Sequence, residues 1–260
     1  MNIFKGFSTG ITAYRQAADI LFSRKFRYFL IFPVAALLLV FIGGQILTSY
    51  WGNDLARHVQ TAVQNWLAGI SWLHWMGEVS GFLIRLLLKV AWFMLFVAFG
   101  GYLVVVIMSP VYSWLSERTE AFLTGREYPF SFRQLLREIF QGILIALRNM
   151  FFQFFLFILF FICSFIPLVG LLSPLILFLV SAYFYGFSFV DYAIERKKFN
   201  VKESVRYVNK NVGAVIGIGG IFTLSLMIPW IGITISCFIS LLSVIAGTIT
   251  VNKIAQDRSL

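Results

Sequence analysis

Charged residues are absent from four long stretches of the chain. These are residues 28–53, 90–116, 149–190 and 211–252. A helix needs about 20 apolar residues to cross a bilayer, so each of the first two stretches predicts one full crossing. The last two are about twice that length and must fold back on themselves. The pattern predicts an all-α integral membrane protein with two long transmembrane helices and two helical hairpins.

Each of the two longest stretches contains the same short motif near its middle. One reads Ile166-Pro167-Leu168-Val169-Gly170 and the other reads Ile228-Pro229-Trp230-Ile231-Gly232. Proline ends a helix because it lacks an N–H and its ring clashes with the preceding turn, and glycine closes a tight turn. This internal repeat predicts two hairpin apices, formed by Pro167 with Gly170 and by Pro229 with Gly232.

The hairpin arms are short for a membrane crossing. The arm 149–165 has 17 residues, or about 25 Å, against a hydrocarbon core of about 30 Å. Charges flank only the outer ends of the two stretches, at Arg148, Asp191, Lys210 and Lys253. These features predict hairpins that penetrate the bilayer partly and return to the side from which they entered. Two ordinary full spans joined by a short loop remain the alternative.

The rest of the chain is amphipathic or polar, and we expect one membrane domain over residues 1–260. Apolar residues at helical spacing predict an N-terminal amphipathic helix that lies along the membrane interface within 1–27. The two long helices occupy 28–116, with an external segment at 48–89. We expect a cytoplasmic helical region at 117–148, hairpins at 149–190 and 211–252, a cytoplasmic linker at 191–210 and a tail at 253–260.

Composition supports the membrane assignment. Apolar residues make up 60% of the chain and charged residues 12%, whereas an average soluble domain is about 25% charged. This excludes an ordinary soluble enzyme, a disordered chain and a nucleic-acid-binding module. The net charge is +10. With the predicted topology, 18 basic residues share one side and three the other, so the positive-inside rule predicts that both termini are cytoplasmic.

The sequence offers little support for enzyme chemistry. His58 and His74 are 16 residues apart with no carboxylate or cysteine at metal-ligand spacing, so we expect no metal site, no cofactor and no enzymatic activity. Cys163 and Cys237 lie in apolar runs and are expected to be small buried side chains. The glycines at 213, 217, 219 and 220 lack the context of a dinucleotide-binding loop and predict close helix packing.

A basic run connects the N-terminal helix to the first apolar stretch. Arg24, Lys25 and Arg27 lie where a helix is expected to begin, and a helix N-terminus offers N–H groups and a positive dipole end. Together these features could bind an oxyanion, and Arg27 is favoured because a guanidinium group binds such an ion in a bidentate manner. Topogenic charge in contact with anionic lipid headgroups is an equally supported interpretation.

A second candidate constellation follows the second long apolar stretch. Glu117 and Glu120 are three residues apart and therefore share one helix face. They could line a pore mouth, but pairing with an arginine such as Arg118, Arg148 or Arg206 is the favoured interpretation.

Residues 109–125 read SPVYSWLSERTEAFLTG. This segment resembles [SA]-P-F-x-x-x-L-x-E-x-x-E-x-x-L-T-G of the CysZ sulfate-transport family of bacteria, which is related to the etoposide-induced 2.4-like membrane proteins, and it is the strongest piece of the resemblance. The others are Ile166-Pro167 with Pro174, Ala182 and Asp191-Tyr192, and then Met227-Ile228-Pro229. All occur in the family's order and spacing.

The resemblance implies a fold with two long transmembrane helices and two partly inserted hairpins. It also implies an inner-membrane location and sulfate or a related oxyanion as the partner. The apolar composition predicts contact with membrane lipids, and a homo-oligomer is expected because non-helical backbone within the bilayer must be covered by protein. The family's anion site is associated with a Gly-x-Arg-Arg turn, and the matching positions here read Lys25-Phe26-Arg27-Tyr28. Only Arg27 is carried over, because Lys25 replaces the glycine and Tyr28 replaces the second arginine.

The resulting functional hypothesis is a channel-like permease that passes sulfate or a related oxyanion into the cytoplasm. The alternative is a non-transporting membrane scaffold or lipid-organising protein, in which the hairpins wedge into one leaflet and the basic run Arg196-Lys197-Lys198 holds anionic lipid. A membrane enzyme ranks third, and no nucleic acid is expected as a partner.

Overall fold

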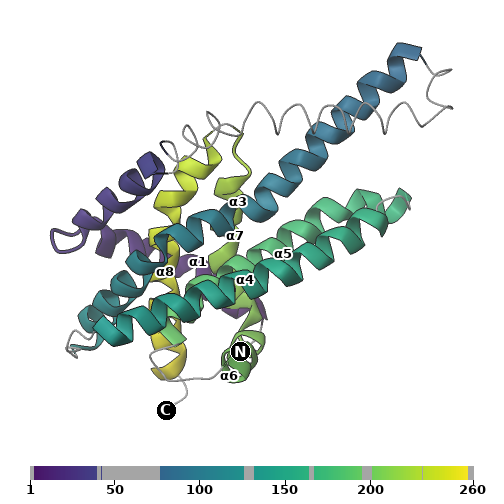
Figure 1. Cartoon of the computed structure of the whole chain (residues 1–260). Coiled ribbons are helices and arrows are strands. Elements are labelled where there is room, and N and C mark those ends of the chain that lie inside the picture. Colours follow the sequence, from purple (N-terminus) through teal and green to yellow (C-terminus); the bar gives the residue numbers. More distant parts are fainter. Residues whose placement is uncertain are drawn as a thin grey trace. The chain divides into compact units, whose positions relative to one another are not determined.

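Helices make up all the regular structure that is described. In the computed structural model, the described residues are 3–39, 42, 77–125, 132–163, 167–194, 201–229 and 231–256. The elements are α1 (Ile3–Leu21), η1 (Arg27–Leu30), α3 (Gly77–Thr124), α4 (Phe132–Cys163), α5 (Pro167–Ile194), α6 (Val201–Lys210), α7 (Val212–Leu226) and α8 (Gly232–Gln256) (Figure 1). Residues 31–39 form a short apolar helix after η1. No strand occurs in these ranges, which confirms the predicted all-α fold.

The chain divides into two compact units. The first comprises Met1–Pro33 with Val97–Leu260, and the second comprises Val34–Phe96. The first unit contains α1, η1, the C-terminal part of α3 and all helices from α4 to α8. The sites discussed below lie in this first unit.

Helix α7 is the centre of the first unit. It packs against α1, α5 and α8, and most of its residues are buried. Its glycines allow backbones to touch: a Cβ on Gly217 would lie 2.7 Å from the Phe7 carbonyl oxygen of α1, and a Cβ on Gly219 would collide with the Ala182 carbonyl oxygen of α5. Small residues permit such approach between helices in lipid. The predicted close packing of this glycine-rich helix is therefore confirmed.

Helix α1 buries small residues along its length, and its N-terminal half turns large apolar residues outward. Gly6, Gly10, Ala13 and Ala17 are buried, and a Cβ on Gly10 would lie 2.5 Å from the Ala214 carbonyl oxygen of α7. The exposed face carries large apolar side chains, which are Ile3, Phe4, Phe7 and Ile11. The sequence periodicity correctly predicts a helix, and the outward apolar face suits contact with lipid.

The buried Tyr14 side chain ties α1 to two other helices. Its hydroxyl donates a hydrogen bond of 2.5 Å to the Ile218 carbonyl oxygen of α7. The Tyr14 hydroxyl oxygen also lies 2.7 Å from Ser243 Oγ of α8. Burial raises the pKa of Tyr14 well above its ordinary value, so the phenol remains a neutral donor. One polar group thus connects three packed helices.

Helix α3 is longer than a simple crossing requires. It has 48 residues, or about 72 Å, and passes without interruption through Ser116 and Glu117. Gly125 ends it with a left-handed φ of 68° and an N–H that donates to the Ala121 carbonyl oxygen at 2.9 Å. This is a common glycine helix stop. The terminal glycine of the residue 109–125 segment therefore has a structural role.

The two helices of each predicted hairpin contact each other, and α5 of the first hairpin also packs on α7 and α8 of the second. Helix α4 lies beside α5, and α7 packs on α8 (Figure 1). Helix α4 has 32 residues and includes 132–148 as well as the predicted arm, because no helix-breaking residue separates these segments. By length and composition, Gly142–Phe160, Leu172–Ile194 and Gly232–Gln256 could each span a membrane. Helix α7, with 15 residues, reaches only about 22 Å. The depth of insertion stays a prediction.

The two proline motifs have different local structures. Pro167 is the first residue of α5 and Gly170 lies inside its first turn, so this glycine does not close the turn. Proline is favoured at a helix start because no partner is needed for its missing N–H. Pro229 instead lies in the exposed turn before α8, which begins at Gly232. A Cβ on Gly232 would lie 2.6 Å from the Leu226 carbonyl oxygen, so close backbone approach explains this glycine.

The cysteines are the other candidate residues that the structure describes. Cys237 is buried as expected, whereas Cys163 at the end of α4 is only half-buried, and both are free thiols. Among the described residues, no group of three or more His, Cys, Asp or Glu side chains could hold a metal ion. His58, His74 and the basic run 196–198 lie outside the described residues.

Candidate anion-binding site

Residues 23–27 form the turn that joins α1 to η1, and we call them the basic turn. The N–H groups of Phe26 and Arg27 both donate to the Ser23 carbonyl oxygen, at 3.1 and 3.0 Å. Ser23 Oγ donates in turn to the Ile20 carbonyl oxygen at 2.7 Å. These backbone donors are used within the turn, so they are not directed at an external anion as the sequence suggested. The N–H groups of Phe26 and Arg27 are therefore not available to an anion, and the charged side chains are the main candidates for binding.

Three cationic side chains project from the basic turn. Arg24, Lys25 and Arg27 are all exposed, whereas Phe26 between them is buried. The structure thus gathers all three predicted basic residues in one short loop. Two guanidinium groups and an ammonium group offer several donors and three positive charges to one anion. Because the groups are exposed, they can exchange ligands with solvent.

A set of aromatic rings fixes the basic turn to α3. The aromatic cluster consists of Phe26, Tyr28, Phe29, Phe32, Trp114 and Phe122. Phe29 is fully buried, and its ring centroid lies 4.8 Å from that of Trp114. Phe26 meets Phe122 edge-to-face at 5.8 Å. Aromatic pairs at these distances and angles are stabilising, so the cluster positions the cationic residues beside α3.

The basic turn packs on the segment of α3 that contains the two predicted glutamates, but on a different face of the helix. Trp114, Arg118 and Phe122 recur every fourth residue and share the face that receives the turn. Arg118 also lies within electrostatic range of Tyr28. Glu117 and Glu120 share another face of the same segment. Both are half-buried, and both interact with other groups.

The proline motifs at the predicted hairpin apices supply no charged group to the candidate anion-binding site. Pro167 and Gly170 begin α5 and carry no ionisable group, and the same holds for Pro229 and Gly232 before and at the start of α8. Their contribution is to end one helix and begin the next.

The structure shows a polar cluster between α3, α4 and α5 that the charge pattern does not reveal. Tyr102 Oη donates to Gln153 Oε1 at 2.8 Å, and Gln153 Nε2 donates to Ser181 Oγ at 2.9 Å. Asn149 Nδ2 donates to Ser188 Oγ at 3.2 Å. All five side chains are buried. Asn149 and Gln153 are four residues apart in an apolar helix, and this uncharged polar spacing is the signal that could have identified them.

Arg148 of α4 and Asp191 of α5, which are close in sequence to residues of the polar cluster, lie within electrostatic range of each other. Asp191 is 2% exposed and faces Arg148 of α4 and Ser204 of α6, but neither of its oxygens has a hydrogen-bond partner within the described part of the chain. The Arg148 guanidinium lies 5.3 Å from the Phe152 ring centroid and 5.7 Å from that of Phe187. The two charges predicted to flank the first hairpin thus lie close together. Ionisable groups at such positions are functional candidates.

Comparison with known proteins places these features in a family. Residues 13–236 match the family described as sulfate transporter CysZ/etoposide-induced protein 2.4. The chain belongs to this family. The matched range contains the basic turn, Glu117, Glu120 and both proline motifs, so the family resemblance in the sequence is confirmed.

Named family members are distant but cover most of the chain. The sulfate transporter CysZ of Pseudomonas fluorescens strain Pf0-1 is 24% identical over 221 residues, which is 84% of each chain. The sulfate transporter CysZ of Pseudomonas aeruginosa strain LESB58 is 25% identical over 213 residues, or 80% of this chain and 81% of that protein. With helices suited to membrane spanning, the comparisons identify a multi-pass membrane protein of the CysZ family.

Proposed function

We propose that this protein transports sulfate, or a related oxyanion, across the bacterial inner membrane into the cytoplasm as a channel-like permease. Family membership over residues 13–236 is the observation that carries the proposal, since relatives of similar length are named sulfate transporters. The exposed cationic side chains on a turn that aromatic packing holds in place support it. No energy source is assigned.

In this proposal the basic turn is the principal binding site for the anion and lies at the cytoplasmic boundary of the membrane. Arg27 is the principal ligand because its planar guanidinium can donate two parallel hydrogen bonds to an oxyanion, and Arg24 and Lys25 raise the local positive potential. Glu117 and Glu120 act on the neighbouring face of α3, where pairing with basic groups sets the field that the anion meets. The half-buried Arg148 on α4 offers a second positive charge.

The membrane arrangement is part of the same proposal. Both termini and most basic residues lie in the cytoplasm, as the positive-inside rule predicts. The hairpins α4–α5 and α7–α8 enter and leave from that side, and the short α7 supports this arrangement for the second pair. Non-helical backbone within a bilayer must be covered by protein or line a water-filled cavity. A homo-oligomer would supply that cover, and α4 exposes suitable apolar residues, which include Phe151, Phe154 and Phe155.

Sulfate uptake by purified protein in liposomes tests the proposal. We expect uptake of labelled sulfate above that of empty vesicles, and Arg27→Ala is expected to reduce it by about tenfold or more because one charge-assisted ligand is lost. Arg15→Ala is the matched control, since Arg15 is also exposed but lies within α1. Uptake equal to that of empty vesicles, or equal loss in both variants, would contradict the proposed role.

A lipid-organising scaffold is the second candidate. The exposed apolar face of α1, with Phe4 and Phe7, supports it, because such a face can enter the headgroup region. Flotation with vesicles that depends on anionic lipid, with no sulfate flux, would favour this function over transport.

A further inference from the structure

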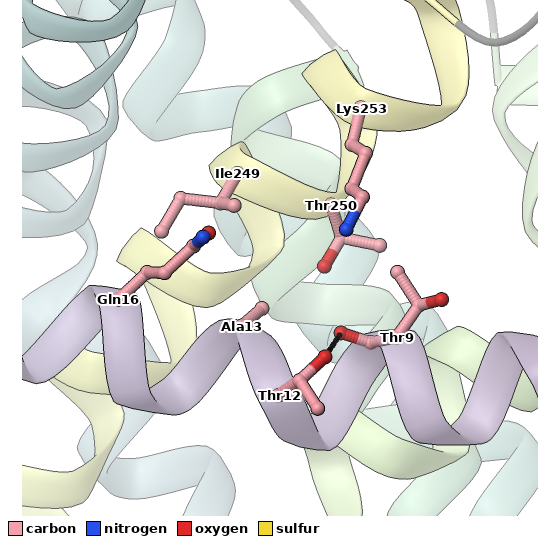
Figure 2. A pocket seen from close by; sticks show the side chains of 7 residues that line it. All are labelled: Thr9, Thr12, Ala13, Gln16, Ile249, Thr250 and Lys253. Carbon is pink, nitrogen blue, oxygen red and sulfur yellow. Dashed lines mark hydrogen bonds between the residues drawn. The ribbon is translucent and has the colours of Figure 1, made fainter.

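A small cavity lies between α1 and α8. Its volume is about 130 Å³, whereas a single buried water needs about 10–15 Å³ of comparable space. The lining residues are Thr9, Thr12, Ala13, Gln16, Ile249, Thr250 and Lys253 (Figure 2). The cavity is thus large enough for a polyatomic ligand, and most of its lining is polar.

Thr250 provides a buried hydroxyl group in the cavity wall that lacks a protein partner among the described residues. Its side chain is 2% exposed, and Oγ1 has no hydrogen-bond partner within the described residues. By contrast, Thr248, two residues earlier on α8, donates to the Val244 carbonyl oxygen, and its Oγ1 lies 2.8 Å from Ser116 Oγ. Buried hydroxyl groups almost always have partners. Figure 2 shows the Thr250 side chain and the Lys253 amine turned toward the same space above α1.

The donors that line the cavity define the chemistry of its ligand. Lys253 carries three N–H donors and a positive charge, Gln16 carries an amide, and Thr250 carries one hydroxyl donor. Thr9 and Thr12 donate their protons to carbonyl oxygens of their own helix, at 2.8 and 2.9 Å. None of the lining residues is acidic. The site therefore presents donors and positive charge, which disfavours a cation and suits an anion with several acceptor oxygens.

The cavity differs from the basic turn in position and in family coverage. Thr9 and Thr12 precede the family-matched range 13–236, and Ile249, Thr250 and Lys253 follow it. Most of the lining is therefore outside the region that identifies the family. Lys253 lies in the last turn of α8, where the helix dipole stabilises a cation.

We propose that the α1–α8 cavity binds one tetrahedral oxyanion group, supplied either by free sulfate or phosphate or by the phosphate of a lipid headgroup. Lys253 neutralises its charge, and Thr250 donates a hydrogen bond at the buried end. Gln16 donates from the side of α1. This site is independent of the proposed transport function.

The first experiment measures binding of inorganic sulfate and phosphate to the full chain in detergent by equilibrium dialysis. An Arg27→Ala background removes the principal ligand of the basic turn. We expect Lys253→Met and Thr250→Val each to weaken binding about tenfold or more, which corresponds to about 1.4 kcal/mol. Lys210→Met is the matched control, because Lys210 is also in the last turn of a helix but does not line the cavity. Size-exclusion elution and a cooperative thermal transition verify that each variant is folded.

The second experiment separates the two sources of the oxyanion. Native mass spectrometry compares binding of dioctanoyl phosphatidic acid with that of dioctanoylglycerol, which lacks the phosphate. Loss of phosphatidic acid binding in Lys253→Met and Thr250→Val, without loss of inorganic ion binding, assigns the site to a lipid headgroup. Unchanged binding of sulfate, phosphate and phosphatidic acid in both variants overturns the proposal. Loss in Lys253→Met alone also overturns it, because a surface charge effect would then be sufficient.

Discussion

At the residue scale, individual polar groups in this molecule join apolar helices. The Tyr14 hydroxyl reaches Ile218 and Ser243 on two other helices, and Gln153 connects Tyr102 to Ser181 in the same manner. An amide or hydroxyl group buried without a partner is costly. Each such residue therefore both stabilises the packing and fixes which helix faces meet.

Replacing Tyr14 by phenylalanine is expected to destabilise the protein. The ring is retained, but the Ile218 carbonyl oxygen and Ser243 lose a buried partner. We expect a loss of about 1–3 kcal/mol, which thermal unfolding in detergent would show as a lower Tm. Tyr183→Phe is the control, because its hydrogen bond to Asn209 is exposed, and it is expected to change the Tm less. Equal shifts would mean that the three-helix junction is not held by the hydroxyl.

At the element scale, glycine makes α7 the helix on which others pack. Its neighbours α1 and α5 approach until backbone atoms touch, at Gly217 on one side and Gly219 on the other. Van der Waals packing drives helix association in lipid, because burial of apolar surface offers no gain there. The absence of side chains at these positions therefore contributes directly to the stability of the bundle.

Two adjacent glycines of α7 provide a sharp test of this packing. A Cβ on Gly219 would collide with the Ala182 backbone, whereas a Cβ on Gly220 would meet nothing within 4 Å. We expect Gly219→Ala to lower the Tm clearly. Gly220→Ala should leave it unchanged or raise it, since alanine favours a helix by up to about 1 kcal/mol over glycine. Similar behaviour of the two variants would contradict the packing described for α7.

The predicted partial insertion of the hairpins can be tested by cysteine accessibility. In a background with Cys163→Ser and Cys237→Ala, single cysteines would replace Ile162 and Ile228, which are both exposed near the proline motifs. We expect membrane-impermeant maleimides outside the cell to leave both positions unlabelled, because partly inserted apices stay within the bilayer. Rapid labelling from outside would instead show that the helix pairs cross the membrane completely.

At the scale of the whole molecule, charge asymmetry and apolar length together predict the topology. Eighteen basic residues are expected on one side and three on the other. The negative surface potential of the cytoplasmic leaflet attracts basic segments, so the asymmetry favours one orientation. With this orientation the basic turn, which lies between α1 and the first apolar helix, would face the cytoplasm, so the proposed anion site would lie at the inner end of the transport path.

Fusions at both ends of the chain test the orientation. We expect green fluorescent protein to be fluorescent and alkaline phosphatase to be inactive at either terminus, because both termini are predicted to be cytoplasmic. A fusion of alkaline phosphatase within residues 54–89 provides the opposite control and is expected to be active. Active phosphatase at the C-terminus would require an odd number of crossings and would contradict the predicted arrangement.

The sequence by itself determined the fold class and the family. Long uncharged runs can only be buried or lie in lipid, and the repeated proline motifs mark where α4 gives way to α5 and α7 to α8. The basic turn was also evident, because Arg24, Lys25 and Arg27 are close in sequence and remain close in the structure. Patterns of this kind depend on neighbouring residues and are therefore readable along the chain.

Tertiary structure decided which distant residues meet. No local pattern could place Trp114 and Phe122 against the basic turn, Asp191 near Arg148, or Thr250 across a cavity from Gln16. It also decided that Gly170 lies inside a helix while Gly232 permits a close backbone contact, although the two motifs look alike. Local chemistry selects a helix or a turn, but the packing of complementary surfaces selects the partners, and that depends on the whole chain at once.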